Sequence, residues 1–287
     1  MNSPFDLSKA PFRVEANADP QQVARDVIVC FRALSNIPDK MTQCVVAAMR
    51  IIGMDDSDPL HRAGCLIARD VDTGTGAGNH NPYHNAQHFC EVLLGTLYLS
   101  LLAPLQQRER AQLLVAAAVH DFHHDGKLNG EVPFRLERLS VEAAMPHLLA
   151  ARVAEAERKR ITAMVLATEV STGARFARRC YLHFAGCGPH PELAGIDSEL
   201  ALLAGDERLA LQAVLLTEAD VLPSVGLTVE YGELQQDKLS REWSKPMREQ
   251  DKLHFLDHVF GEFTVSTFFS PNLRRLKQAM HQKAKAG

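Results

Sequence analysis

Five of the 13 histidines in this chain lie in two short pieces, "NPYHNAQHF" and "AVHDFHHDG", each of which also carries polar neighbours. In the first piece His84 and His88 are four residues apart. On a helix this spacing puts both side chains on one face, with roughly 5–6 Å between their Cβ atoms. Such a pair can bind one metal ion, or one histidine can bind metal while the other transfers a proton. Taken alone, the pair is more often typical of surface or structural histidines.

The second piece places His120 and Asp121 directly after the apolar run "QLLVAAAV", which is expected to pack in the interior. Burying these two residues is costly unless the charge is paired or bound to metal. Imidazole nitrogen and carboxylate oxygen are ligands that divalent zinc, manganese and iron accept. The alternative is a helix end decorated with polar residues, to which His123 and His124 would also belong.

A third candidate is Asp220, which follows another apolar run in "LQAVLLTEADVLPSVG" and precedes a proline. A carboxylate buried at such a position needs a cation, although a single aspartate at a helix end is more often a cap or a surface acid. Taken together, the three elements predict a metal site between helices.

The sequence that must position these residues is helical nearly throughout. Segments such as "QQVARDVIVCFRAL", "TQCVVAAMRII" and "RERAQLLVAAAVH" repeat apolar residues every three or four positions. Alternating runs of β-branched residues bounded by tight turns are missing. We therefore predict an all-α fold of roughly ten to twelve helices in one domain, residues 20–283, preceded by a flexible arm over residues 1–19.

Composition narrows the class of protein. The chain has 287 residues, of which 46% are hydrophobic and 23% charged, as in soluble globular proteins. A formal charge of −4 offers no basic surface, so nucleic acid is not an expected partner. The longest apolar stretch, "VLLGTLYLSLLAPL", is too short to span a bilayer, and no signal peptide is visible. We expect a cytoplasmic protein with a small-molecule partner and no membrane partner; the oligomeric state is not predicted.

The order His, then His-Asp, then Asp resembles that of the HD superfamily of metal phosphohydrolases. More closely, "YHNAQH", "HDFHHDGKLN", "SVEAAMPHLL", "VLATEVS" and "EADV" resemble, in this order, the motifs of the class I 3′,5′-cyclic nucleotide phosphodiesterase catalytic domain. The similarity runs from about residue 81 to residue 260, most of the chain. It implies a compact multi-helix domain with a metal pocket between its helices.

The resemblance implies a role for each motif residue. Two divalent ions are expected, Zn²⁺ together with Mg²⁺ or Mn²⁺, and His88, His120, Asp121 and Asp220 match the ligands of the tighter one. Asp121 would bridge to the second ion, and a bridging hydroxide would attack phosphorus. His84 matches the general acid that protonates the departing 3′ oxygen.

Four further positions match residues that support the metals or orient metal-bound water: His124, Glu142, Thr168 and Glu169. Glu169 departs from the family, which usually has aspartate there. His123 has no family counterpart and is expected to be exposed.

The substrate side resembles the family less closely. The family has a phenylalanine that stacks on the purine and a glutamine three residues before it. Here Phe255 is the expected clamp, but Lys252 occupies the glutamine position. Gln250 could replace that glutamine only if the local backbone shifts. Tyr83, in the first motif, is placed with these substrate-binding residues.

The function that this pattern favours is metal-dependent hydrolysis of cAMP or cGMP to 5′ monophosphates. An HD nucleotidase or another phosphoester hydrolase with a diverged base pocket is the alternative, and Lys252 motivates it. A di-iron oxygenase would need His123 or His124 as additional ligands. A non-catalytic nucleotide sensor is disfavoured because it has no need for His84 beside the metals.

Overall fold

The computed structural model describes residues 18–75 and 80–286, and these residues form twelve α-helices, three short helical turns and no strand. The all-α prediction is therefore confirmed, while the predicted N-terminal arm lies almost wholly outside the described residues. The helices are α1 Pro20–Leu34, α2 Lys40–Ile51, α3 Pro59–Thr73, α4 Ala86–Leu102, α5 Gln107–Val119, α6 Arg135–Ala150, α7 Glu155–Leu166, α8 Gly173–Phe184, α9 Glu207–Val225, α10 Val229–Glu242, α11 Glu249–His254 and α12 Ser270–Ala286. The short turns are η1 Leu200–Gly205, η2 Phe255–Phe260 and η3 Thr267–Phe269.

Local sequence fixes several helix starts. The side chain of Asp19 accepts hydrogen bonds from the first backbone amides of α1, and Asp58 does the same for α3. In both helices a proline is the first residue, where its missing N–H costs no intrahelical hydrogen bond. These caps explain why the two helices begin at Pro20 and Pro59.

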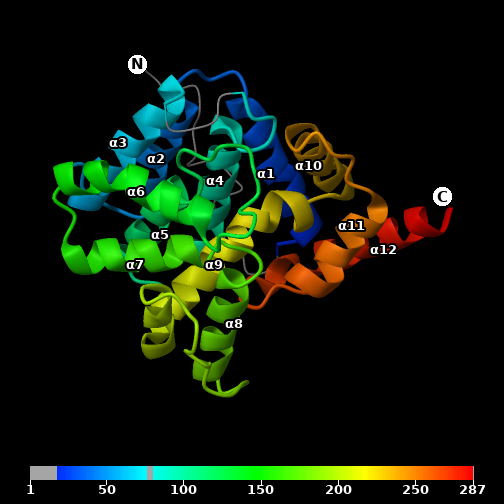
Figure 1. Cartoon of the computed structure of the whole chain (residues 1–287). Coiled ribbons are helices and arrows are strands. Elements are labelled where there is room, and N and C mark those ends of the chain that lie inside the picture. The colour runs from blue at the N-terminus through cyan, green and yellow to red at the C-terminus, as the bar shows by residue number, and fades with distance from the viewer. Residues whose placement is uncertain (1–17, 76–79, 287) are drawn as a thin grey trace.

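The centre of the molecule is α4, which packs against α1, α2, α5 and α9. Figure 1 shows α4, α5 and α9 running through the middle of the molecule, with the other helices around them. From His88 to Ser100 every residue of α4 is buried. A polar side chain on this helix must therefore find its partners inside the protein.

The long helix α9 also crosses the core, and it departs from the sequence expectation. The proline after Asp220 suggested a helix end, but α9 continues through Pro223 to Val225, which leaves Asp220 inside the helix. In the described part of the chain no single helix is long and apolar enough to cross a membrane; α9 and α10 pass that test only as a pair, bent by 97°.

Candidate metal centre

Four side chains from three helices converge on one point. The Nε2 atom of His88 lies 3.4 Å from Nε2 of His120, 3.3 Å from Oδ2 of Asp121 and 3.4 Å from Oδ1 of Asp220. The Nε2 atom of His120 lies 3.1 Å and 3.7 Å from the same two carboxylate oxygens. Ligands held at about 2.0–2.1 Å around a tetrahedral ion lie roughly 3.3–3.5 Å from one another. The four groups that we predicted as ligands therefore fit one small divalent cation.

The start of α4 sets the positions of the first two histidines. Asn85 caps this helix by accepting hydrogen bonds from the backbone amides of Gln87 and His88, so the helix begins at Ala86. His84 therefore precedes the helix, contrary to the expectation that it shares a helical face with His88. The rings still lie close, with centroids 5.6 Å apart, because the capped turn folds His84 back beside the cluster.

His120 directly follows α5 as its C-cap and has the tautomer that a metal ligand needs. Its Nδ1 lies 2.8 Å from the carbonyl oxygen of Ala117, and only a ring that carries its proton on Nδ1 can donate there. Nε2 then presents its lone pair to the cluster. His88 is held differently, by the ring of Tyr83 packed at a centroid distance of 4.5 Å.

The charge balance of the cluster also favours a cation. Burial opposes protonation of His88, but the neighbouring carboxylates of Asp121 and Asp220 outweigh it and raise the pKa of His88 to about 9. For Asp121 burial disfavours the charged form, yet the adjacent imidazoles of His120 and His84 hold its pKa well below the ordinary value. Two partly buried carboxylates side by side thus favour positive charge nearby, which protons supply when no cation is bound.

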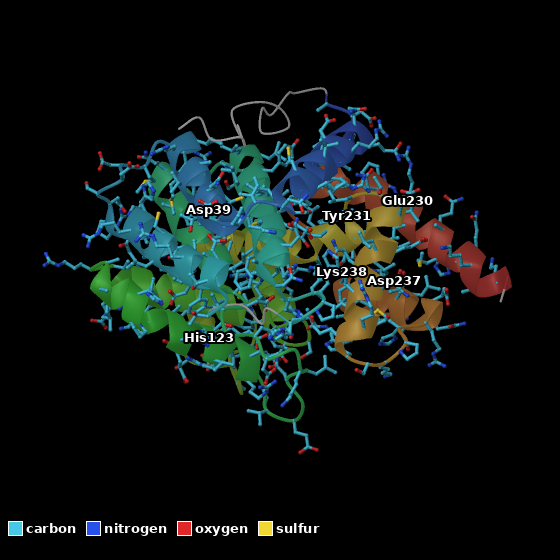
Figure 2. All side chains as sticks on the ribbon, turned by 90° about the horizontal axis from the view of Figure 1, so that it is seen from above. Asp39, His123, Glu230, Tyr231, Asp237 and Lys238 are labelled. Carbon is cyan, nitrogen blue, oxygen red and sulfur yellow. The ribbon has the colours of Figure 1, made fainter. Side chains whose placement is uncertain are left out.

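Asp121 also belongs to a second group with ligand character. This group consists of His84, Asp121 and His124, each of which offers one ligand atom. The three atoms lie within 4.8 Å of one another. The His124 ring stacks on His84 with centroids 3.7 Å apart, and burial lowers the pKa of His124 to about 4, which keeps it neutral. His123, by contrast, is exposed, as expected (Figure 2).

Sequence reasoning missed the residue that orients His84. The Glu242 carboxylate, at the end of α10, pairs with Nδ1 of His84 and accepts hydrogen bonds from the backbone amides of Tyr83 and His84, at 2.8 and 2.9 Å. Burial alone would raise the pKa of Glu242, but these bonds outweigh it and lower the pKa. A glutamate 158 residues away from its histidine leaves no local sequence signal.

The glutamate of α6 that faces the centre is Glu137, and the prediction for Glu142 is wrong in position. Glu142 is exposed, whereas Glu137 is buried and accepts a 3.0 Å hydrogen bond from Asn129. Burial, with the negative charges of Asp121 and Glu169 nearby, raises the pKa of Glu137 to about 7. The motif resemblance selected the wrong turn of this helix.

Thr168 and Glu169 are both buried but engaged locally. The Thr168 hydroxyl donates to the carbonyl of Val165 at 2.7 Å. The Glu169 carboxylate accepts from the backbone amides of residues 171–173 and so stabilises the start of α8. Thr168 also lines the cavity that borders Asp220, whereas Glu169 is occupied as a helix cap.

The cavity beside Asp220 is narrow, about 30 Å³, and Phe255, the expected substrate clamp, is one of the residues that line it. Two cations, Arg175 and Arg178, also line it. The guanidinium group of Arg175 donates to the carbonyl oxygen of His258 at 3.0 Å, and that of Arg178 donates to the carbonyl oxygen of Glu262 at 2.8 Å. These bonds fix the helical turn η2 on which Phe255 lies.

The other predicted substrate residues do not line this cavity. Lys252 is buried, and its amine donates to the carbonyl of Ser224 at 3.1 Å. Gln250 is exposed. Tyr83 is buried, with its hydroxyl 3.2 Å from Ser224 Oγ. Its ring packs against the rings of His84 and His88, so it helps to hold these two histidines in place.

Comparison with known proteins places this geometry in a known fold. No family model and no curated protein sequence matches the chain. Among solved structures, the phosphodiesterase domain of the RhoPDE fusion protein from the choanoflagellate Salpingoeca rosetta aligns at a TM-score of 0.58 and 19% identity, covering 95% of this chain and 93% of that chain. LmjPDEB1, solved in complex with IBMX, aligns at a TM-score of 0.63 and 15% identity, covering 99% and 96%.

These likenesses extend over nearly the whole length of each chain. The protein therefore has the fold of phosphodiesterase catalytic domains, and the resemblance noted in the sequence is confirmed at the level of fold. The cluster of His88, His120, Asp121 and Asp220 lies between the helices of that fold.

Proposed function

We propose that this protein is a metal-dependent phosphodiesterase that hydrolyses 3′,5′-cyclic nucleotides, cAMP or cGMP, to 5′ monophosphates. The observation that carries the proposal is the cluster of two imidazoles and two carboxylates, set in the fold of phosphodiesterase domains. His88, His120, Asp121 and Asp220 would hold one ion, Zn²⁺, and Asp121 would face a second, Mg²⁺ or Mn²⁺. Bound there, such cations supply a nucleophile at neutral pH and neutralise charge on the phosphate.

The protein's own acid is His84. Its Nε2 lies 3.9 Å from Oδ2 of Asp121, at the edge of the cluster, while Nδ1 is held by Glu242. Glu242 therefore fixes the ring, with Nδ1 on the carboxylate and Nε2 on the side of the cluster. The proton passes from Nε2 to the departing 3′ oxygen, and Glu242 itself stays ionised.

A specific observation favours a second candidate, a hydrolase for another phosphoester. The cavity beside Asp220 is lined by Arg175 and Arg178, and its volume of about 30 Å³ is far below that of usual ligand pockets, roughly 300–1,000 Å³. A more anionic substrate would gain from the two arginines.

The test is an assay of cAMP, cGMP and bis(p-nitrophenyl) phosphate hydrolysis with added Mn²⁺ or Mg²⁺. Asp121→Asn should lose activity by at least about 10²-fold, whereas Asp125→Asn, an exposed aspartate on the same loop, should retain it. Cleavage of the artificial diester alone would refute the cyclic nucleotide substrate and support the second candidate. Metal binding without any cleavage would refute both hydrolases.

A further inference from the structure

A second cavity lies apart from the metal centre, where α1, α10 and α12 meet. It has a volume of about 610 Å³, and none of the four candidate metal ligands lines it. The start of α10 forms one wall; Figure 2 labels Glu230 and Tyr231 on this part of the helix. Its size falls within the usual range for small-molecule sites, roughly 300–1,000 Å³.

Three arginines give this cavity a positive charge. Arg25 and Arg32, seven residues apart on α1, share one helical face, and Arg275 comes from α12. Arg25 lies 4.0 Å from Asp19, while among the described residues Arg32 and Arg275 have no ion-pair partner. One acid, Glu230, also lines the cavity, so positive charge predominates there although the whole chain carries −4. Such a concave surface attracts anions.

The wall also contains a buried acceptor. Asn272 is 3% exposed, and its Nδ2 donates to the carbonyls of Pro20 and Gly226 at 3.0 and 3.1 Å. These two bonds fix the orientation of the amide, because a flipped amide would place oxygen against oxygen. Its Oδ1 is then left without a hydrogen-bond partner among the described residues. A buried acceptor of this kind is costly unless a ligand or water donates to it.

The remaining wall supplies an apolar surface. Val29 is 64% exposed although it is a large apolar side chain, and Leu227 and Val229 lie across the cavity. The first turn of α10 borders the cavity with Thr228 and Glu230, and helix N-termini favour phosphate groups. Cationic, apolar and hydrogen-bonding surfaces thus occur together in one cavity.

We propose that this cavity binds a phosphorylated organic molecule of mononucleotide size. Its phosphate lies between Arg32 and Arg275, and its apolar part rests on Val29. This proposal is independent of the reaction proposed for the metal centre.

The test is calorimetric titration of the intact, metal-loaded protein with 5′-AMP and, separately, with inorganic phosphate. An Arg32→Ala/Arg275→Ala variant should weaken one AMP-binding event at least tenfold. Arg274→Ala, which removes an exposed neighbour of Arg275 that does not line the cavity, should leave it unchanged. Both targeted arginines are exposed, so the fold is expected to survive.

Two outcomes would overturn the proposal. One is AMP binding that is unaltered in the double variant or weakened equally by Arg274→Ala. The other is inorganic phosphate binding as tightly as AMP, which would show that the organic part makes no contact. If the metal centre proves inactive, an arginine-dependent AMP event would still appear, so the two proposals fail separately.

Discussion

Replacing Lys252 with methionine removes a charge from the interior while keeping nearly the same side-chain volume. The side chain is 3% exposed, and burial lowers the pKa of its amine from 10.5 to about 8. At pH 7 that difference corresponds to about 3 kcal/mol of destabilisation from keeping the amine charged. Losing the hydrogen bond to Ser224 costs about 1 kcal/mol. Lys252→Met should therefore raise the free energy of unfolding by about 2 kcal/mol at pH 7.

The pH dependence gives this prediction its sign. Because the pKa of Lys252 is lower in the folded state, the unfolded chain binds a proton between about pH 8 and pH 10.5 that the folded chain has released. The stability of the natural protein therefore rises with pH in that window. The advantage of Lys252→Met should shrink over the same window and vanish at about pH 10, where the remaining charge cost equals the lost hydrogen bond of about 1 kcal/mol; at higher pH the variant should be the less stable protein.

Urea unfolding of the natural protein and of Lys252→Met, at pH 7 and at pH 10, gives the difference between their free energies of unfolding at each pH. Lys245→Met, at an exposed lysine of the preceding loop, is the matched control and should change stability by less than about 0.5 kcal/mol. Because Lys252 does not line the cavity beside Asp220, KM for the substrate should stay unchanged. A variant less stable than the natural protein at pH 7, or a gain equal at both pH values, would refute the reasoning.

Three more outcomes are expected. Glu242→Gln should lower kcat by about 10–100-fold with little change in KM, because His84 loses the carboxylate that holds its ring. An unchanged kcat in steady-state assays would count against this role of Glu242. Gly173→Ala should lower the free energy of unfolding by about 1–3 kcal/mol, since its Cβ would lie 2.2 Å from the carbonyl oxygen of Leu166. Gly205→Ala is the control, because a Cβ there would meet no atom within 4 Å. A chelator should lower the melting temperature, and Zn²⁺ at 100-fold its Kd should then raise the free energy of unfolding by about 2.7 kcal/mol. Equal melting curves with and without the chelator would contradict a cation at the cluster.

The candidate ligands could be predicted because each occupies a position that local sequence makes unusual. His120 and Asp121 follow an apolar helix, and Asp220 follows an apolar run of another, so each polar group was expected to be at least partly buried and to need a partner. The all-α fold followed from periodicity for the same reason: helices that bury one face repeat apolar residues every three or four positions.

The residues that periodicity could not place depend on helix phase or on distant contacts. Glu142 and Glu137 lie on the same helix, and only the packing of α6 decides that Glu137 is the buried one. Glu242 reaches His84 from the far end of the chain, through the packing of α10 against α9. Neither relation has a local pattern, because side-chain direction and tertiary packing determine both.

The substrate side was the least predictable part, and its construction explains why. The segment that carries Phe255 is held by Arg175 and Arg178 of α8, which bind its carbonyls, and by Glu218 of α9, whose carboxylate accepts from backbone amides of residues 264–266. Burial of the Glu218 carboxylate raises its pKa in spite of these hydrogen bonds. Keeping this carboxylate ionised in the interior therefore costs free energy, which the hydrogen bonds from the backbone amides offset only in part. Backbone atoms of the segment make these particular hydrogen bonds, so the bonds do not depend on which side chains the segment carries. Lys252, on α11 ahead of this segment, occupies the expected glutamine position and points into the interior, so the motifs of the candidate metal ligands do not identify the side chains on the substrate side.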